Sequence, residues 1–221
     1  HDMAREHRVL WRLPDALPLA PRSYHLCQDH AITGADFQLI EYRPGRGIRG
    51  DSLGDLARLP DAPARLTALM ADTLAKLHRV DPAAVGLSDL GHPDGFLDRA
   101  ISGWAARNGR LPASASSDRL AADLVNWMSD ARRTVPARRP ALLHCDFKLD
   151  NLLLAEGCLD PVALIDWDMC TRGDPLFDLA TLLSYWVEPG DPPAMHELGQ
   201  MPSVTAGFPG RTAMTEAYAQ A

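Results

Sequence analysis

Apolar residues recur at three- and four-residue intervals in several stretches of the chain, separated by polar positions. This spacing is typical of amphipathic helices with one buried face. It predicts helices over His1–Leu13, Pro63–Val80, Phe96–Asn108, Asp118–Arg133 and Arg211–Ala221. A polar loop is predicted over Pro112–Ser117. A further helix is expected after Asp174 and Pro175, because Asp favours the N-cap and Pro the first helical position.

Strand-length apolar runs predict two hairpins. Leu152–Leu154 and Val162–Ile165 are joined by the polar, Gly-containing loop Ala155–Pro161, which is typical of an antiparallel pair. Tyr24–Cys27 and Phe37–Tyr42 have the same character and predict a second pair nearer the N-terminus.

Polar residues gather at the open end of the later hairpin. If Leu152 lies opposite Ile165, Asn151 and Asp166 face each other, with His144 and Asp146 just upstream. Carboxylate and amide oxygens suit a hard cation such as Mg²⁺. The five-residue step from Asp146 to Asn151 is also that of a kinase catalytic loop, where the Asp orients a hydroxyl and the Asn holds a metal ion.

Composition narrows the classes of function. The 221 residues are 46% hydrophobic, enough for one sizeable core or two small lobes. The net charge of −7 argues against nucleic acid as a partner. No apolar run is long enough to predict a membrane span, and no signal peptide is visible. The four cysteines lack CxxC spacing, which favours free thiols in a reducing, cytoplasmic setting over a zinc site.

A literal G-x-G-x-x-G pattern spans residues 45–50, but we reject a phosphate-binding interpretation. Asp51–Gly54 is turn-like, so no convincing helix begins at Gly50, and no second strand with a terminal acid follows. We expect a flexible turn here, with Arg46 and Arg49 as weak candidates for contact with an anionic substrate.

Three motifs in order carry a resemblance to a known family. The chain resembles the aminoglycoside phosphotransferases, and within them the kinase-like domain found beside some acyl-CoA dehydrogenases, through His144-x-Asp146-x4-Asn151, Ile165-Asp166-Trp167-Asp168 and Gly173-Asp174-Pro175-x2-Asp178. The resemblance implies an α+β, protein-kinase-like, two-lobed fold with a mainly helical C-terminal lobe. Residues 1–44 would form the remnant of a small N-terminal lobe and the hinge, and residues 45–221 the helical lobe.

The resemblance also implies roles for the residues of the loop and the hairpin. Asp146 would orient the acceptor hydroxyl, and His144 would brace the loop. Lys148 would lie near the γ-phosphate of ATP or face solvent. Asn151 and Asp166 would hold Mg²⁺. Asp168 would join them through water or remain a solvated acid, and Asp178 would hydrogen-bond the catalytic loop or simply favour the helix dipole.

Cofactor contacts are implied in the small lobe. A helical Glu in this family pairs with the ATP-binding Lys, which singles out Glu6, although a solvated surface charge explains it equally well. Main-chain groups of Glu41, Tyr42 and Arg43 would contact adenine as the hinge, unless they form a plain edge strand.

Two departures from the family keep alternatives open. Cys145 stands where the family usually has Gly. Family members also carry a Gly-rich hairpin and a strand Lys ahead of the Glu6 helix, and this sequence has neither before Glu6. We therefore expect an ATP- and Mg²⁺-dependent kinase of a small hydroxylated molecule. The alternatives are a kinase-like module that binds nucleotide without catalysis and a metal-dependent phosphohydrolase. The acceptor stays open among aminoglycosides, amino alcohols, sugars and hydroxy-acyl compounds.

Overall fold

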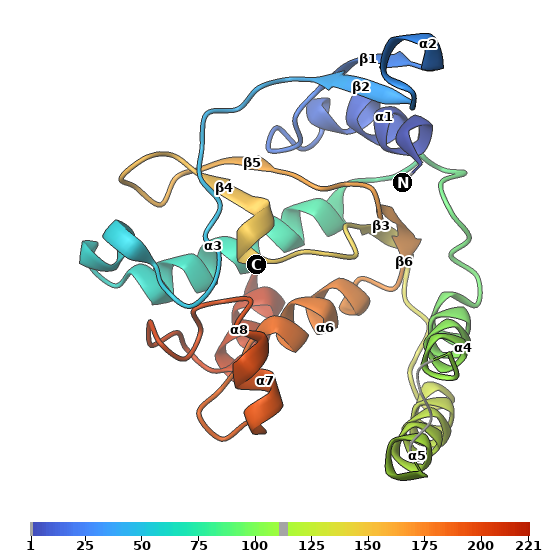
Figure 1. The fold of residues 1–221 in the computed structure, drawn as a ribbon, viewed down its shortest axis with the longest axis vertical. Helices are drawn as coiled ribbons and strands as arrows, with labels where there is room; N and C mark the ends of the chain where they lie inside the picture. Colours follow the sequence, from blue (N-terminus) through green and yellow to red (C-terminus); the bar gives the residue numbers. More distant parts are fainter. Residues whose placement is uncertain (1, 111–114) are drawn as a thin grey trace.

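The N-terminal part is a small layer of one helix under a two-stranded sheet. The computed structural model describes residues 2–110 and 115–221. Helix α1 (Met3–Arg12) is capped by Asp2, whose Oδ1 accepts from the Arg5 amide at 3.0 Å. It packs against the antiparallel strands β1 (Ser23–Cys27) and β2 (Phe37–Ile40), with the short helix α2 (His30–Thr33) between them (Figure 1). The helix predicted from His1 therefore begins at Met3, and His1 lies outside the described residues.

A second, helical part lies below this layer in Figure 1. Its elements are α3 (Ala62–Arg79), α6 (Leu176–Tyr185), α7 (Pro193–Leu198) and α8 (Arg211–Gln220). The predicted apolar stripe of α3 is its buried face, because Leu66, Met70 and Leu74 have no exposed surface. This face packs against α8 and against strand β3 (Ala141–Leu143). In the described ranges, no helix is both long enough and apolar enough to cross a membrane.

Two short antiparallel strand pairs lie between these layers. Strand β3 pairs with β6 (Thr171–Gly173), and β4 (Leu152–Leu154) pairs with β5 (Pro161–Leu164), so the predicted later hairpin is confirmed. The expected register is wrong by one residue, because Leu152 lies opposite Leu164 rather than Ile165. The turn is tighter than predicted, because the Ala155 amide donates to the Asp160 carbonyl at 2.9 Å and Leu154 pairs with Pro161, two residues away from the expected register. An irregularity between Leu153 and Leu154 then restores one residue.

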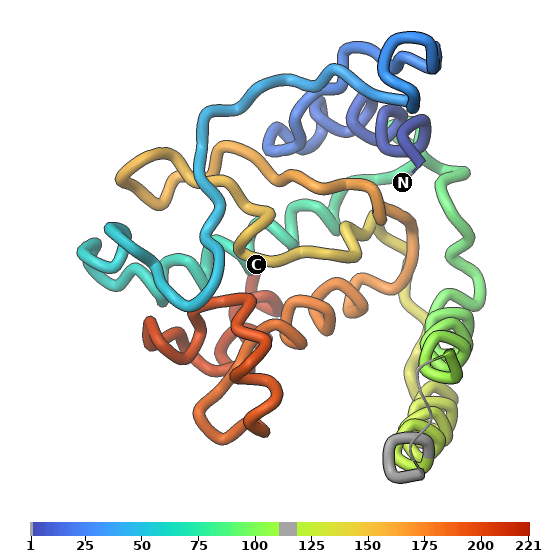
Figure 2. The backbone as a smooth tube through the Cα atoms, in the orientation of Figure 1, coloured from blue at the N-terminus to red at the C-terminus, as the bar shows by residue number. Residues whose placement is uncertain are grey.

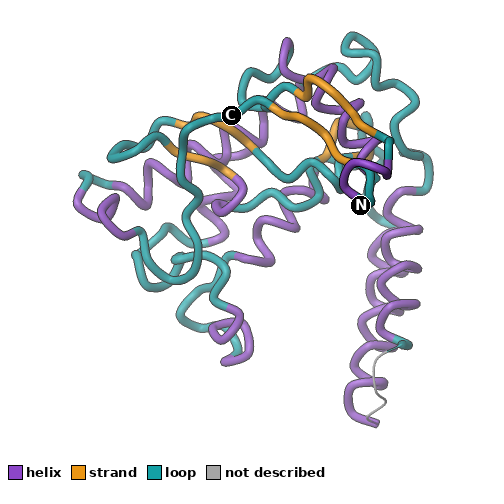
Figure 3. Tube along the Cα trace, turned by 45° about the horizontal axis from the view of Figure 1, so that its top comes forward, coloured by secondary structure: helices purple, strands orange, loops and turns teal. Residues whose placement is uncertain are grey.

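Helices α4 (Phe96–Asn108) and α5 (Ala115–Arg132) pack side by side and project from the rest of the protein (Figures 1 and 3). The predicted loop over Pro112–Ser117 is wrong at its C-terminal end, where α5 already begins at Ala115, and its residues 112–114 lie outside the described ranges. Ser residues are favoured both at helix starts and in loops, so composition alone does not distinguish a helix start from a loop here.

The segment after β2 crosses the β4–β5 hairpin in an extended conformation (Figure 2). Arg46 forms a bridge with Leu154, with the two amide-to-carbonyl bonds at 2.9 and 3.0 Å. A Cβ at Gly45 would lie 2.4 Å from Val162 Cγ2, and one at Gly47 would lie 2.4 Å from the Asp150 carbonyl oxygen. The predicted turn is therefore wrong over residues 45–49, where these glycines permit a close backbone approach, and a turn begins only at Gly50.

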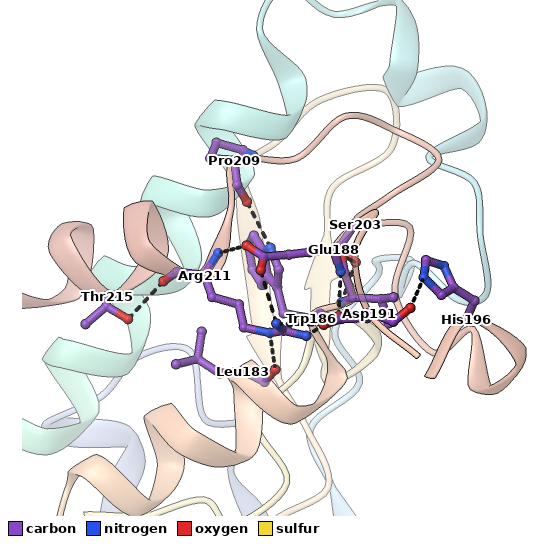
Figure 4. A network of polar contacts seen from close by, with 10 residues as sticks. Leu183, Trp186, Glu188, Asp191, His196, Ser203, Pro209, Arg211 and Thr215 are labelled. Carbon is purple, nitrogen blue, oxygen red and sulfur yellow. Dashed lines mark hydrogen bonds and ion pairs between the residues drawn. The ribbon is translucent and has the colours of Figure 1, made fainter. Parts of the chain in front are cut away.

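The start of α8 is fixed to the end of α6 by Arg211 (Figure 4). Its guanidinium pairs with Glu188 at 3.1 Å and with Asp191, and its Nε donates to the Trp186 carbonyl at 2.8 Å. The Arg211 amide donates to Glu188 Oε1 at 2.7 Å. Such charge-assisted, multidentate contacts fix direction as well as distance, so α8 starts from a defined point against the α6 end.

Candidate active site

The loop that follows β3 is fastened to helix α6 by one buried carboxylate. Asp178 Oδ2 accepts from the His144 amide and Oδ1 from the Cys145 amide, both at 2.7 Å, and Asp178 has no exposed surface. Cys145 has a φ of 66°, in the left-handed region that favours glycine. The loop therefore turns sharply at Cys145, which explains a preference for Gly at this position.

A second layer supports Asp178. His78 of α3 places Nε2 3.2 Å from Asp178 Oδ2, and its Nδ1 lies 2.7 Å from the Tyr218 hydroxyl of α8. The side chain of His78 is only 6% exposed, so we interpret it as a packed group that supports Asp178 and not as a catalyst. Helices α3, α6 and α8 thus meet behind the loop, and each contributes one side chain to its support.

His144 connects the loop to the β4–β5 hairpin. Its Nε2 lies 2.9 Å from the carbonyl oxygen of Ile165, and its Nδ1 accepts from the Asp146 amide at 3.3 Å. This pattern requires a neutral ring with its proton on Nε2. Burial lowers the pKa of His144, outweighing the opposite effect of the nearby Asp178 carboxylate. The ring is therefore suited to bracing and not to accepting a proton.

Asp146 is held by three donors. Its Oδ2 accepts from Lys148 Nζ at 2.8 Å and from Asn151 Nδ2 at 3.1 Å, and its Oδ1 accepts from the Tyr185 hydroxyl at 2.8 Å. Burial opposes ionisation, but the hydrogen bonds from Lys148 and Tyr185 outweigh it and hold the pKa of the Asp146 carboxyl below its usual range. Asp146 is thus a charged acceptor of fixed direction, and Lys148 is turned toward it instead of into solvent.

The residues predicted to hold a metal ion lie beside this carboxylate. The Ile165 amide donates to the Asn151 carbonyl at 2.9 Å, which places Asn151 and Asp166 at adjacent positions across the hairpin end. The Asn151 amide nitrogen donates to Asp146, which leaves the amide oxygen as a ligand atom. Burial, and then the charges of Asp168 and Asp146, raise the pKa of Asp166.

This donor set fits Mg²⁺. A carboxylate whose pKa is raised by neighbouring carboxylates, as that of Asp166 is, favours a cation beside it, and oxygen atoms are the ligands that Mg²⁺ prefers. Across the described ranges, no three His, Cys, Asp or Glu side chains form a metal-binding group by themselves. One or two carboxylates completed by substrate phosphates is the usual arrangement for Mg²⁺, whereas the phosphohydrolase alternative needs a fuller protein ligand set.

Glu6 brings helix α1 to the same acidic residues. Burial, and then the charges of Asp168 and Asp166, raise the pKa of this α1 carboxyl, which also accepts a hydrogen bond from the Trp167 backbone. The structure therefore places Glu6 against the acidic hairpin end. A half-buried carboxylate in this position favours a cationic partner.

Glu41, Tyr42 and Arg43, the residues predicted to contact adenine, differ in how far they are already bonded or exposed. The Glu41 amide donates to the Arg22 carbonyl at 2.7 Å, and its carboxylate pairs with Arg43 at 2.7 Å. Tyr42 is 86% exposed. A cavity of about 470 Å³ adjoins Tyr42 and the β4–β5 turn, but none of the acidic residues described above lines it. Of the three predicted hinge residues, Tyr42 alone lines this cavity, and the acidic cluster lies outside it.

An apolar groove of about 740 Å³ adjoins the loop on its other side. It runs between the α4–α5 pair and the loop, and Cys145, the neighbour of Asp146, forms part of its wall. Its aromatic wall consists of Phe96, Trp104, Trp127 and Phe177. The charged side chains of the lining are Arg99, Arg107 and Arg132, and no Asp or Glu of the described residues belongs to it. The groove has the size and character of a small-molecule site.

Sequence reasoning missed Tyr185 and Tyr218. Tyr185 lies seven residues after Asp178 on α6, so it faces the same side of the helix two turns later. That spacing was a usable signal once Asp178 had been placed at the loop. No comparable signal pointed to Tyr218, because its partner His78 lies 140 positions away in the chain.

Comparison with known proteins agrees with this geometry. The model of the phosphotransferase enzyme family (APH) matches residues 1–216. Curated relatives include acyl-CoA dehydrogenase family member 10 of Mus musculus, 30% identical over 85% of this chain and 17% of that protein. Acyl-CoA dehydrogenase family member 11 of Gallus gallus is 30% identical over 90% of this chain and 25% of that protein. The chain thus spans a quarter or less of these two relatives.

Solved structures show the same fold. A putative aminoglycoside phosphotransferase of Ralstonia eutropha JMP134 is 24% identical, with a TM-score of 0.74 over 99% of this chain and 64% of that one. Aminoglycoside phosphotransferase APH(4)-Ia, solved with AMP-PNP and hygromycin B, is 18% identical, with a TM-score of 0.61 over 84% of this chain and 61% of that one. The expected α+β, kinase-like fold is therefore confirmed, and the chain belongs to the phosphotransferase enzyme family.

Proposed function

We propose that this protein is an ATP- and Mg²⁺-dependent phosphotransferase that moves the γ-phosphate of ATP to a hydroxyl of a small molecule. The observation that carries the proposal is the Asp146 carboxylate, ionised and aimed by three donors next to Asn151 and Asp166. Phosphoryl transfer depends on positioning and charge neutralisation more than on covalent chemistry, and this site supplies both.

Each residue then has a defined task. Asp146 orients the acceptor hydroxyl and takes up its proton. Asn151 and Asp166 supply oxygen ligands for Mg²⁺, with Asp168 beside them, and Mg²⁺ when bound neutralises phosphate charge. His144 keeps the loop in place, and Lys148 fixes Asp146. Glu6 pairs with a cation near the phosphates, and main-chain groups of residues 41–43 contact adenine, except the Glu41 amide, which bonds Arg22.

The properties of the apolar groove favour one class of acceptor substrate over the others. Its aromatic and aliphatic walls suit a hydrophobic body, and its three arginines suit a neutral or anionic group. A polycationic aminoglycoside would instead require acidic side chains in the lining. We therefore favour a hydroxy-acyl compound, whose hydroxyl would reach Asp146 past Cys145.

An acceptor panel tests this proposal. ADP formation is measured with 10-hydroxydecanoate, its coenzyme A thioester, kanamycin, choline and glucose, each with Mg²⁺ and ATP. We expect turnover with the hydroxy-acyl compounds and none above background with kanamycin. Nucleotide binding without turnover for any acceptor would instead favour a non-catalytic module. Turnover of kanamycin would contradict the inference that the groove selects a hydroxy-acyl compound.

A pair of variants on one helix locates the acceptor. Ala100 lines the groove, whereas Ala106 lies on the exposed side of the same helix α4. Ala100→Trp fills the groove and is expected to raise the acceptor KM at least tenfold, while the KM for ATP stays within twofold. Ala106→Trp adds the same volume outside the groove and should leave both values unchanged.

A further inference from the structure

The two oxygens of Asp146 are not equivalent. Oδ2 accepts two hydrogen bonds, from Lys148 Nζ at 2.8 Å and from Asn151 Nδ2 at 3.1 Å. Oδ1 accepts one hydrogen bond, from the Tyr185 hydroxyl at 2.8 Å. A carboxylate oxygen has two lone pairs in the plane of the group, so each accepts about two bonds in favourable geometry. Oδ2 is therefore filled, and Oδ1 keeps one lone pair for a further donor.

The position of Tyr185 allows it to hold the Asp146 carboxylate in the orientation that leaves Oδ1 with an open lone pair. It is the last residue of α6, the helix whose Asp178 holds the backbone of the same loop through His144 and Cys145. One helix thus fixes both the loop backbone and the side chain of Asp146. The Tyr185 ring also lies 5.3 Å from Lys148 Nζ, within the range of a cation–π contact. Tyr185 therefore contacts both the Asp146 carboxylate and Lys148, one of its other donors.

We propose that Tyr185 is a positioning residue, which holds the Asp146 carboxylate so that the open lone pair of Oδ1 meets the acceptor hydroxyl. This inference rests on the proposed phosphotransferase function. In the step that it serves, the acceptor oxygen bonds to the γ-phosphorus while the bond from that phosphorus to the β–γ bridging oxygen breaks. The hydroxyl proton passes to Asp146 Oδ1, and the electron pair of the broken bond leaves with ADP.

Tyr185 does not take up that proton itself. Its hydroxyl proton is already directed at Asp146, and burial together with this bond raises the pKa of Tyr185 to about 12. It therefore acts through Asp146. A rotation of the carboxylate by a few tens of degrees would aim the open lone pair elsewhere, and small misplacements of reacting groups reduce rates strongly.

The test is Tyr185→Phe in the full chain, assayed with Mg²⁺, ATP and the most active acceptor of the panel above, or with water as acceptor where none is active. Phe keeps the ring and removes only the hydroxyl. We expect kcat to fall about tenfold to a hundredfold, in proportion to one hydrogen bond to a charged group. The Kd for ATP and the KM values should stay within twofold. Tyr24→Phe, on an exposed strand position, is the matched control and should match the wild type.

A double-mutant cycle separates positioning from a general structural effect. If Tyr185 acts through Asp146, Tyr185→Phe should change the residual rate of the Asp146→Ala variant less than twofold in single-turnover assays. An equal fractional loss in both backgrounds would overturn the inference.

A crystal structure of Tyr185→Phe gives an answer that does not depend on turnover. We expect the Asp146 carboxylate to rotate away from its wild-type orientation, and an unchanged orientation would overturn the inference. Absence of ATP turnover in the wild type with every acceptor, water included, would refute the proposed function instead. The orientation of Asp146 in the variant would still decide the role of Tyr185.

Discussion

The imidazole of His144 lies with Nε2 2.9 Å from the carbonyl oxygen of Ile165. This bond joins the loop that bears Asp146 to the strand end that bears Asp166, although His144 and Ile165 are 21 positions apart in the chain. The ring has no exposed surface, so water does not compete for the bond. The proposed base and the proposed metal ligands are consequently held in one rigid unit.

Burial of His144 predicts a loss of stability in mild acid. Its pKa is lowered in the folded state, whereas the unfolded chain has the ordinary value of about 6.5. Below that pH the unfolded chain binds a proton that the folded protein does not. The free energy of unfolding therefore decreases as the pH is lowered, by up to about 1.36 kcal/mol per pH unit. Urea unfolding at pH 7.5 and 5.5 measures the slope.

His144→Gln keeps a donor for the Ile165 carbonyl but has no side chain that titrates. The slope of the free energy of unfolding against pH should therefore be smaller in this variant, by an amount that corresponds to up to one proton. His25→Gln, at an exposed position of β1, is the control and should keep the wild-type slope. A His144→Gln slope equal to the wild type would mean that other groups cause the acid sensitivity.

The sequence predicted the parts of this site that depend on local order. The step from Asp146 to Asn151 and the two apolar runs of the hairpin are short-range features, and both keep their expected places. The register error arose because the turn is tighter than predicted and the strand pairing is irregular between Leu153 and Leu154, and hydrophobic pattern alone specifies neither feature. The support of Asp178 by His78 and Tyr218 depends on how helices far apart in the chain pack, which periodicity does not encode.

The left-handed backbone at Cys145 predicts a specific tolerance. A φ of 66° disfavours any residue with a Cβ and most of all a β-branched one. Cys145→Gly should leave the free energy of unfolding unchanged or slightly higher, whereas Cys145→Val should lower it by about 2 kcal/mol. Cys158→Val, at a position without positive φ, is the control, and urea unfolding measures all three. A Cys145→Val protein as stable as the control would show that the loop relaxes freely.

The close approach at Gly47 predicts a clash. A Cβ there would lie 2.4 Å from the Asp150 carbonyl oxygen, a backbone atom next to Asn151. Gly47→Ala should therefore push the loop away from the extended segment and lower both the melting temperature and kcat. Gly190→Ala is the matched control, because its Cβ would meet no atom within 4 Å and its φ is not positive. Equal melting temperatures for the two variants would contradict the role given to Gly47.

Asp166 should be required for the response to metal. Asp166→Ala removes a carboxylate from the acidic cluster, and we expect Mg²⁺-dependent turnover to disappear while the protein stays folded. Two effects on its stability oppose each other: relief of repulsion with Asp168 and Asp146 stabilises the variant, whereas the left-handed φ of 69° at this position suits Asp better than Ala. Asp130→Ala, on the exposed side of α5, is the control for charge alone. Turnover with an unchanged Mg²⁺ titration in Asp166→Ala would rule out Asp166 as a ligand.

Asp146→Asn separates chemistry from binding. Asparagine keeps the shape of the side chain but lacks the charge that orients and accepts the hydroxyl proton. A positioned general base contributes about 10²–10⁴-fold in rate, or about 3–5 kcal/mol, so kcat should fall by that factor. The Kd for ATP, measured by calorimetry, should stay within a few-fold, because Asn151 and Asp166 are the proposed metal ligands. Asp160→Asn, in the β4–β5 turn, is the control and should keep wild-type values. If kcat and ATP affinity collapse together, Asp146 holds the metal or the loop; if neither changes, the activity lies outside this loop.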